Sequence, residues 1–591
     1  MAAPANQPTL HDPLPLASGQ VLPNRLMKSA LSEGLANPDN APDARLERLY
    51  GRWSDGGYGL IVTGNVMVDR RHCGEPGNVA MEDERHLDAM TRWAKVAKDG
   101  GSKVWVQLNH PGRQANPIVT RTRAVAPSAI AMGIPGVPAP RALSEDEIGD
   151  IIARFGRAAR VAEAAGFDGV QIHGAHGYLV SQFLSPLSNQ RTDAWGGDAE
   201  KRRRFVVEVA RSIRAAVSPS FGLGIKLNSA DFQRGGFTED ESRAVIEELS
   251  GEGLDLFEIS GGSYESPAMM GRPRTASEST RAREAYFLDY AETARKAAGS
   301  VPIAVTGGFR SHAAMSEALG SGTCDVVGLG RPTAVIPTAA ADLLTERTDT
   351  LRPPHISLGL PPRLAANGSL KSFDGALDLQ WHTDQLHLIG AGKEPNPERS
   401  PWLTAAAMLR RNGFDAFRSK RSATQHKSGA SKGDAASKGD AASKGDAASK
   451  AARKFRTERA VGRYVMNPTV RALDKVGIRT AFATELETVG RKSGEPRRVP
   501  ISVLFDDEGA WAICQHGLRS GWGLNLSANP NIRLRQGDRW RTGTAVLLPD
   551  DDVVARSRGF APHPLLAPLA RGMFAVLESD PVTVRITFTD N

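Results

Sequence analysis

Short apolar runs alternate with longer segments of helical periodicity along the first part of the chain. Each run is rich in β-branched residues or leucine and is bounded by glycine, proline or polar residues, which is typical of a buried strand. The runs span residues 25–31, 59–64, 103–108, 169–173, 223–228, 255–260, 302–307 and 325–330. Segments between them, such as 146–166 and 286–299, repeat apolar residues at helical spacing.

Eight strands joined by helices predict a (β/α)8 TIM barrel for the N-terminal part of the chain. A doubly wound open sheet is the alternative that the same pattern leaves open. A barrel gathers its chemistry at the carboxyl ends of its strands. The residues found at those ends are Gln107, His110, His173, His176, Lys226, Gly307, Gly308, Gly330 and Arg331.

The C-terminal pattern is different, because β-rich runs alternate there with tight turns. The turns carry the sequences KSGEP, DDEG and RQGD, and residues 456–591 are therefore expected to form a small β-barrel. An exact hexapeptide repeat, SKGDAA, precedes this region over residues 431–450. It has no large apolar side chain and cannot bury a core, so it predicts a tether that spans roughly 25 Å. The repeat leaves open whether it is natural or engineered.

We therefore expect four parts in the chain. Residues 1–365 would form the barrel, and 366–420 would form a helical extension that packs on it. Residues 421–455 would be the flexible linker, and 456–591 the second domain. The 591-residue chain is long enough for more than one core, in line with this division.

Composition narrows the class of protein. The 40% of hydrophobic and 24% of charged residues are normal for soluble globular proteins. No run of 18 apolar residues occurs and the N-terminus lacks a secretory signal, so we expect no membrane association. Three widely separated cysteines, Cys73, Cys324 and Cys514, argue against a disulfide framework and give no cluster for zinc or iron–sulfur. They favour a cytoplasmic location.

The net charge of +8 is concentrated in a few basic runs, such as 201–204. These runs lack interleaved aromatic residues and nucleic acid-binding motifs. Anionic cofactors explain them better than DNA does, so no nucleic acid partner is expected. Whether the chain forms a homo-oligomer is left open.

Glycines close the last two strand runs, in TGGF and GLGRP. At Gly307, Gly308 and Gly330 backbone N–H groups could approach an anion, and Arg331 could add a charged fork. The ends of the last two strands are the usual phosphate position in barrels. The sequence therefore predicts a phosphate-bearing ligand.

Two imidazoles and a phenol follow the fourth strand in the stretch HGAHGY, as His173, His176 and Tyr178. No acidic residue close in sequence completes a metal triad, so a metal is disfavoured. Imidazole N–H groups can instead stabilise charge that develops on a carbonyl oxygen, and a phenol can donate a proton. A polar loop without catalytic role and a metal-dependent hydrolase remain as alternatives.

Residues from about 10 to 340 resemble the old yellow enzyme family of flavin-dependent ene-reductases. The resemblance rests on QLNHPGR (107–113), on HGAHGYLVSQFLSPLSNQRTDAWGGDAEKRRRF (173–205), and on VTGGF and GLGRP. It implies a barrel that binds FMN and reduces activated C=C bonds, such as those of enones, by hydride transfer from the reduced flavin.

The resemblance also implies roles for individual residues. The implied FMN contacts are Ser32, Gln107, Gly307, Gly308, Gly330 and Arg331. His173 and His176 would bind the carbonyl oxygen of the substrate, and Tyr178 would protonate its α-carbon. Two positions depart from the family: Lys226 stands where many relatives have arginine, and Asn65 where many have a small residue. Both would still face the flavin, and lysine loses the bidentate fork.

The stretch T-x-GRKSG-x-PR, followed by W-x-x-NL-x-ANP, resembles the deazaflavin-dependent nitroreductase family of split β-barrels. This likeness implies binding of the deazaflavin coenzyme F-420, a hydride carrier. The implied contacts are Arg491, Lys492, Ser493, Gly494, Trp522 and Asn525. On the residues alone, a basic hairpin turn without a ligand is the alternative.

The sequence thus predicts a two-domain oxidoreductase. The FMN barrel would reduce enones, and the C-terminal domain would supply or recycle reducing equivalents through F-420. The alternative is an NADH- or NADPH-dependent ene-reductase whose C-terminal domain is a non-catalytic cofactor-binding or dimerisation module.

Overall fold

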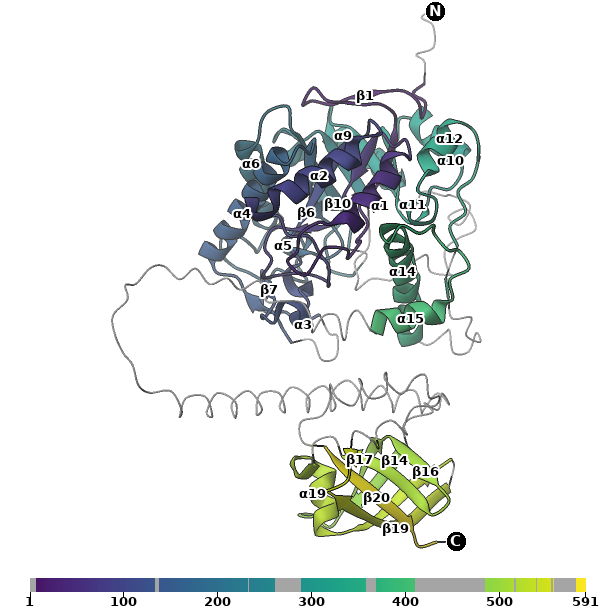
Figure 1. The fold of residues 1–591 in the computed structure, drawn as a ribbon. Helices are drawn as coiled ribbons and strands as arrows, with labels where there is room; N and C mark the ends of the chain where they lie inside the picture. The colour runs from purple at the N-terminus through teal and green to yellow at the C-terminus, as the bar shows by residue number, and fades with distance from the viewer. Residues whose placement is uncertain are drawn as a thin grey trace, which may run out of the picture. The chain divides into compact units, whose positions relative to one another are not determined.

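The computed structural model describes residues 7–132, 138–231, 233–260, 288–354, 356–357, 368–409, 484–514, 517–537, 539–553, 556 and 581–590. These residues belong to two compact units, one before residue 427 and one after it (Figure 1). The expected linker, 421–455, lies outside the described residues. Each unit is considered by itself.

Eight parallel strands form a closed barrel in the first unit. Around the barrel they are β3 (Leu26–Lys28), β4 (Leu60–Val62), β6 (Lys103–Asn109), β9 (Gly169–Gly174), β10 (Gly222–Asn228), β11 (Leu256–Ser260), β12 (Ile303–Thr306) and β13 (Val326–Leu329). The sheet closes because β13 pairs with β3. Each strand falls within a run predicted from the sequence or overlaps it closely, and the TIM barrel, not the open sheet, is confirmed.

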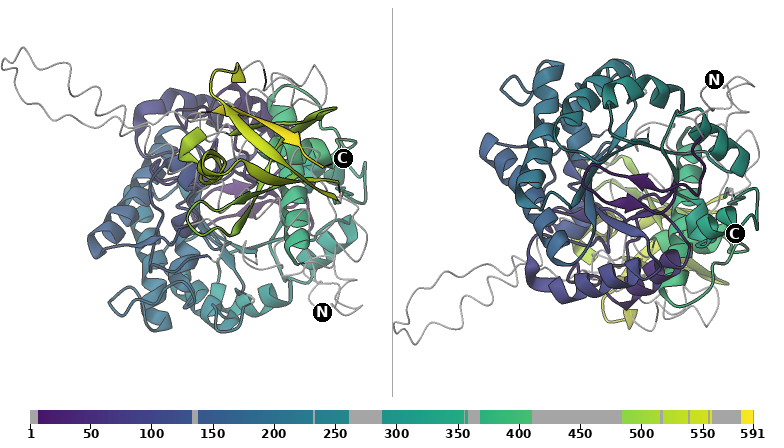
Figure 2. Two further views of the ribbon diagram at one scale, coloured as in Figure 1. Left: turned by 90° about the horizontal axis from the view of Figure 1, so that it is seen from below. Right: turned by 90° about the horizontal axis from the view of Figure 1, so that it is seen from above.

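Helices surround the strands in a ring, as the view from above shows (Figure 2). They are α1 (Ala44–Ser54), α2 (Leu87–Lys98), α4 (Glu145–Ala164), α5 (Leu179–Leu184), α6 (Ala199–Ala216), α7 (Glu239–Ser250), α9 (Leu288–Ala298), α10 (His312–Gly320), α11 (Pro332–Val335) and α12 (Ala339–Leu344). Capping boxes at Ser144 and Thr238 fix the first residues of α4 and α7.

Trp105 fills the amino-terminal part of the barrel interior. A Cβ atom at Gly169, Gly222 or Gly224 would come within 2.4–2.8 Å of the indole, so only glycine leaves room for it. The indole shares an apolar cluster with leucines of the hairpin β1 (Leu14–Pro15) and β2 (Val21–Leu22). This hairpin covers the amino-terminal end of the barrel, where Ser18 and Gln20 bond to Asp255, Asp168 and Ser220.

Helix α14 (Gly368–Gly390) packs against α1 and α11, and α15 (Pro401–Leu409) follows it. Trp381 of α14 is fully buried. His387 donates from Nε2 to the carbonyl oxygen of Glu33 at 2.8 Å. The extension is therefore tied to the segment that follows β3.

The second unit is one antiparallel sheet with the strand order β15-β14-β18-β19-β20-β17-β16. The strands are β14 (Thr484–Val489), β15 (Pro496–Ile501), β16 (Val503–Asp506), β17 (Gly509–Cys514), β18 (Asn531–Gln536), β19 (Arg539–Leu548) and β20 (Val582–Phe588). Only Ser502 separates β15 from β16, although they lie at opposite edges. The sheet must therefore curl until its edges meet, as in the predicted small β-barrel.

No helix in the described part of the chain combines the length and the apolar character needed to cross a bilayer.

Candidate active site

A layer of polar side chains lies inside the barrel, between Trp105 and the carboxyl ends of the strands. Residues two apart on a strand share one face, so the interior positions of β6 continue from Trp105 to Gln107 and Asn109. The corresponding interior positions of the next three strands are Gln171 and His173, Lys226 and Asn228, and Glu258 and Ser260, all of them buried. Lys226 pairs in register with His173 on one side and Glu258 on the other.

Glu258 is the centre of a hydrogen-bond network in this layer. Its Oε1 lies 2.9 Å from Nζ of Lys226 and accepts a 2.6 Å hydrogen bond from Thr306. Its Oε2 accepts from Nε2 of Gln171 at 2.8 Å, and Oε1 of Gln171 accepts from Nε2 of Gln107 at 2.8 Å. Burial opposes the charge, but Lys226 and the hydrogen bonds outweigh it and lower the pKa of Glu258.

The imidazoles and the phenol of HGAHGY gather where β9 ends. His176 and Gly177 take left-handed backbone conformations, with φ of 61° and 73°, which turns the chain sharply before α5. The ring centroid of His173 lies 5.1 Å from that of His176 and 4.7 Å from that of Tyr178. The three predicted catalytic side chains are thus adjacent.

Hydrogen bonds orient the two imidazoles. The N–H of Ala175 donates to Nδ1 of His173 at 3.4 Å, so the hydrogen of this neutral imidazole lies on Nε2. Nε2 of His176 lies 3.1 Å from Oγ of Ser260. The backbone N–H of His176 donates to Oδ1 of Asn228 at 3.3 Å. The site therefore presents an N–H donor at His173.

Burial keeps both imidazoles uncharged. It lowers the pKa of His173 well below its ordinary value, and nearby His176 and Lys226 lower it further. Burial, with Lys226, lowers the pKa of His176 to about 3. At neutral pH the pair can donate hydrogen bonds without carrying charge.

The predicted phosphate residues lie together at the ends of β12 and β13. Gly307 and Gly308 have φ of 127° and 95°, conformations that favour glycine. A Cβ at Gly330 would meet only one atom within 4 Å, at 3.8 Å, so the space beside it is open. Arg331 is 2.7 Å from Asp378 of α14, an anchor that the sequence did not indicate.

Ser32 and Asn65 also meet, although they follow different strands. Oγ of Ser32 lies 2.9 Å from Oδ1 of Asn65 and also contacts the carboxylate of Glu75, so its single hydrogen serves these two acceptors. The carboxylate of Glu33 accepts the N–H of Gly64 at 2.9 Å and so joins the two segments. Glu33 and Glu75 are contacts that the motifs did not reveal.

Buried polar atoms without protein partners indicate a ligand at this end of the barrel. Among the described residues these atoms include both side-chain polar atoms of Asn109 and Nδ2 of Asn228. An unpaired buried amide is costly, so a polar ligand is expected to satisfy these groups. Together with the glycine cradle at Gly307 and Gly308, they fit a phosphate-bearing, hydrogen-bonding cofactor such as FMN.

The predicted site of the second unit is built on the turn between β14 and β15. Gly494 has φ of 68°, as the tight turn requires. Arg491, Lys492 and Ser493 are exposed on this turn. Asn525, in α19 (Gly521–Ala528), accepts from the backbone N–H of Arg491 at 3.3 Å and donates to Oγ1 of Thr488 at 3.1 Å. Asn525 therefore positions the turn.

Trp522 precedes Asn525 on α19 and packs, partly buried, against the core of the sheet. It lies on the same helix as Asn525, which contacts the turn. Nothing in its packing assigns it a ligand.

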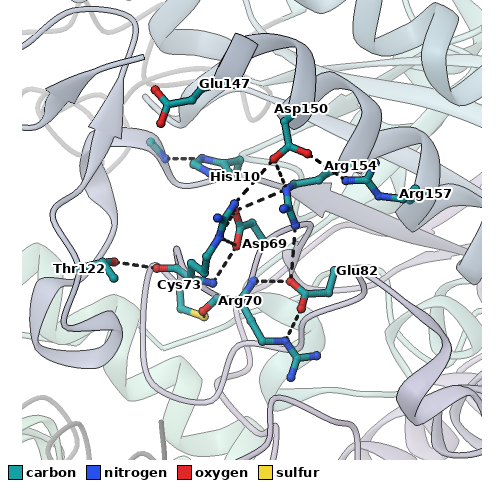
Figure 3. Close-up of polar contacts among 12 residues, drawn as sticks. Asp69, Arg70, Cys73, Glu82, His110, Thr122, Glu147, Asp150, Arg154 and Arg157 are labelled. Atoms are coloured by element: carbon teal, nitrogen blue, oxygen red, sulfur yellow. Dashed lines mark hydrogen bonds and ion pairs between the residues drawn. The ribbon is translucent and has the colours of Figure 1, made fainter. Parts of the chain in front are cut away.

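A second cluster of titratable groups lies between α4 and the loop after β5 (Val66–Met67) (Figure 3). Asp69, His72 and His110 bring potential ligand atoms within 4.8 Å of one another. Arg71 lies 2.7 Å from the carboxylate of Asp69, and Arg154 of α4 lies 3.7 Å from it. These guanidinium groups offset the charge that would attract a cation, so the cluster serves to join the loop to α4.

The fold and the site define a class, the flavin-dependent oxidoreductases built on a (β/α)8 barrel. The chain belongs to the NADH:flavin oxidoreductase / NADH oxidase family, whose model matches residues 9–349. The model of the quinone reductases that depend on reduced F-420 matches residues 456–562. These matches confirm the predicted two-part oxidoreductase and its cofactors, FMN and F-420.

Curated relatives cover the barrel. The NADH-dependent flavin oxidoreductase iliE of Hypocrea jecorina is 39% identical over 55% of this chain and 86% of its own length. The NADH-dependent flavin oxidoreductase iccE of Talaromyces variabilis is 40% identical over 54% of this chain and 83% of its own.

Solved structures show the same fold. 2-Naphthoyl-CoA reductase, bound to 2-naphthoyl-CoA, superposes with a TM-score of 0.54 at 25% identity over 58% of this chain and 53% of its own. The old yellow enzyme homologue of Zymomonas mobilis gives a TM-score of 0.51 at 24% identity over 58% of this chain and 94% of its own.

Proposed function

We propose that the barrel reduces the C=C bond of α,β-unsaturated carbonyl compounds. The observation that carries the proposal is the pair of adjacent imidazoles, His173 and His176, beside the phenol of Tyr178. The Nε2–H of His173 can donate to a carbonyl oxygen and stabilise the charge that develops there. Reduced FMN, held by the residues of the polar layer and the strand ends, would supply the hydride for the β-carbon.

Tyr178 donates the proton to the α-carbon in this proposal. Its side chain is only 8% exposed and lies against His173. A buried, positioned phenol can transfer its proton to carbon without competition from bulk water. The same imidazole that orients the carbonyl group therefore also places the proton donor.

The FMN contacts that we assign come from several strand ends. They are Ser32, Asn65, Gln107, Lys226, Gly307, Gly308, Gly330 and Arg331. The cradle at Gly307 and Gly308 and the charge of Arg331 suit the phosphate, and the polar layer suits the hydrogen-bonding edge of the ring.

We assign F-420 binding in the second domain to the turn 490–494 and to α19. The exposed charges of Arg491 and Lys492, with Ser493, suit an anionic coenzyme, and Gly494 permits the turn. Trp522 and Asn525 complete the assignment. Through bound F-420, the second domain would supply or recycle the reducing equivalents that the barrel uses.

NADH is the alternative donor to the barrel. Relatives matched over the barrel carry the name NADH-dependent flavin oxidoreductase. This naming favours NADH over NADPH, which the sequence left open.

The visible spectrum is the first test. The purified chain should be yellow, with one FMN per barrel, and a colourless protein would end the proposal. Turnover of an enone is then measured with reduced F-420 alone and with NADH alone. Oxidation of reduced F-420 that depends on the enone supports coupling of the two domains, whereas turnover with NADH alone leaves the second domain uncoupled.

A further inference from the structure

We infer that Glu258 is a positioning residue that controls the FMN site through Lys226 and Gln107. The inference rests on the proposed binding of FMN over the polar layer. It adds how the protein sets the electron affinity of that cofactor. Neither the motifs nor the family resemblance pointed to Glu258.

The ion pair of Lys226 and Glu258 is the first way in which Glu258 would act on the cofactor. The side chains of Lys226 and Glu258 are 4% and 0% exposed, and they lie 2.9 Å apart. A buried lysine alone would favour a negatively charged, reduced flavin. Glu258 offsets this charge, so the pair is electrically balanced. The affinity of the cofactor for electrons therefore depends on both residues.

The orientation of Gln107 is the second link. An ionised carboxylate only accepts hydrogen bonds, so Gln171 must turn its NH2 group toward Glu258. Its oxygen is then left to accept from Gln107, at 2.8 Å. This fixes the NH2 group of Gln107 on the side of Gln171 and leaves its oxygen on the other side. An accepting oxygen is what an N–H of the flavin ring requires.

Neighbouring hydroxyls hold the carboxylate of Glu258 in place. Thr306 donates its hydrogen to Glu258 at 2.6 Å, so the 2.7 Å contact with Ser29 must use the hydrogen of Ser29. A Cβ at Gly328 would lie 1.9 Å from Oγ1 of Thr306. The threonine hydroxyl therefore occupies space that only glycine at position 328 leaves open.

Glu258→Gln tests the charge link, because it keeps the size of the side chain and removes its charge. The uncompensated Lys226 should raise the midpoint potential of bound FMN. We expect at least a tenfold change in the reduction equilibrium, or about 30 mV for a two-electron couple. Lys226→Met should shift the potential the other way, and the double variant should return close to the unmodified protein.

Two further variants separate this role from a structural one. Gln171→Leu leaves the ion pair intact, so it should weaken FMN binding severalfold without moving the potential. Asp255→Asn removes a buried carboxylate at the amino-terminal end of β11, where it accepts from Leu223 and Ser18. It should lower the unfolding midpoint and leave the potential unchanged.

The potential and the dissociation constant of FMN are measured by spectrophotometric titration without an enone. A failure of enone turnover would thus leave the inference standing. An unchanged potential in Glu258→Gln would overturn it, and so would a double variant whose potential stays at the value of Lys226→Met. If Glu258→Gln alone does not fold, the double variant compared with Lys226→Met decides the charge link.

Discussion

The two units present their chemistry in opposite ways. In the barrel, His173, His176 and Lys226 are buried or nearly so, and each is held by neighbours in the polar layer. In the second unit, Arg491 and Lys492 stand exposed on a turn. Burial changes the protonation of a group and strengthens its hydrogen bonds, whereas an exposed charge is screened by water. The barrel therefore suits chemistry that changes bonds, whereas the exposed turn suits the anion binding that we propose for it.

The largest expected effect is at Tyr178. Tyr178→Phe should lower kcat for an enone by about 10²–10⁴-fold, because it removes a positioned proton donor. FMN content should not change. Tyr58→Phe is the control, since its hydroxyl donates to Pro337 away from the site. Steady-state kinetics that showed full turnover in Tyr178→Phe would place the proton donor elsewhere.

Acid should destabilise the barrel through its buried imidazoles. The pKa of His176 falls to about 3 on folding, so the unfolded chain takes up the proton first. Stability is then fully present above about pH 6.5 and is lost as the pH falls toward 3. We expect about 1.4 kcal/mol per pH unit for each such imidazole.

Urea unfolding of the barrel at about pH 7, 6 and 5 measures this slope. His176→Asn should reduce the dependence of the unfolding free energy on pH by the contribution of one imidazole, because asparagine does not titrate. An equal slope in the variant would mean that other groups control the acid sensitivity.

A smaller effect is expected at Asp378, which forms an ion pair with Arg331, the residue assigned to the phosphate of FMN. Asp378→Asn should weaken FMN binding about threefold to tenfold, since Arg331 is 44% exposed and water screens the pair. Asp384→Asn is the matched control on the same helix, where the carboxylate bonds Arg399 and Thr404. Fluorescence titration of FMN distinguishes them, and equal losses would assign the effect to the helix.

The smallest effect is expected on the exposed turn. Arg491→Ala should weaken F-420 binding a few-fold, and added salt should reduce the difference. Arg533→Ala serves as control, because this arginine pairs with Glu487 on the neighbouring strand. The FMN potential should be the same in both. If Arg491→Ala leaves F-420 binding intact at low salt, the coenzyme binds elsewhere.

The sequence by itself determined the barrel and predicted that polar residues gather at the ends of its strands. Each strand of the barrel was recognisable because burial imposes a local periodicity of apolar residues. Gly307, Gly308 and the HGAHGY stretch were recognisable for a similar reason, since a tight turn or a strand end restricts the residues within a few positions. The second unit was predicted from its turns.

Only the tertiary structure decided which polar groups meet. Gln171 and Glu258 are 87 residues apart, and Arg331 and Asp378 are 47 apart. Periodicity tells which face of a strand a residue occupies, but strand register and helix packing decide what lies opposite. The sequence therefore did not distinguish Glu258 from other charged residues in strands. The closed barrel places it against Lys226, and because both side chains are shielded from water, either charge without its partner would be strongly destabilising.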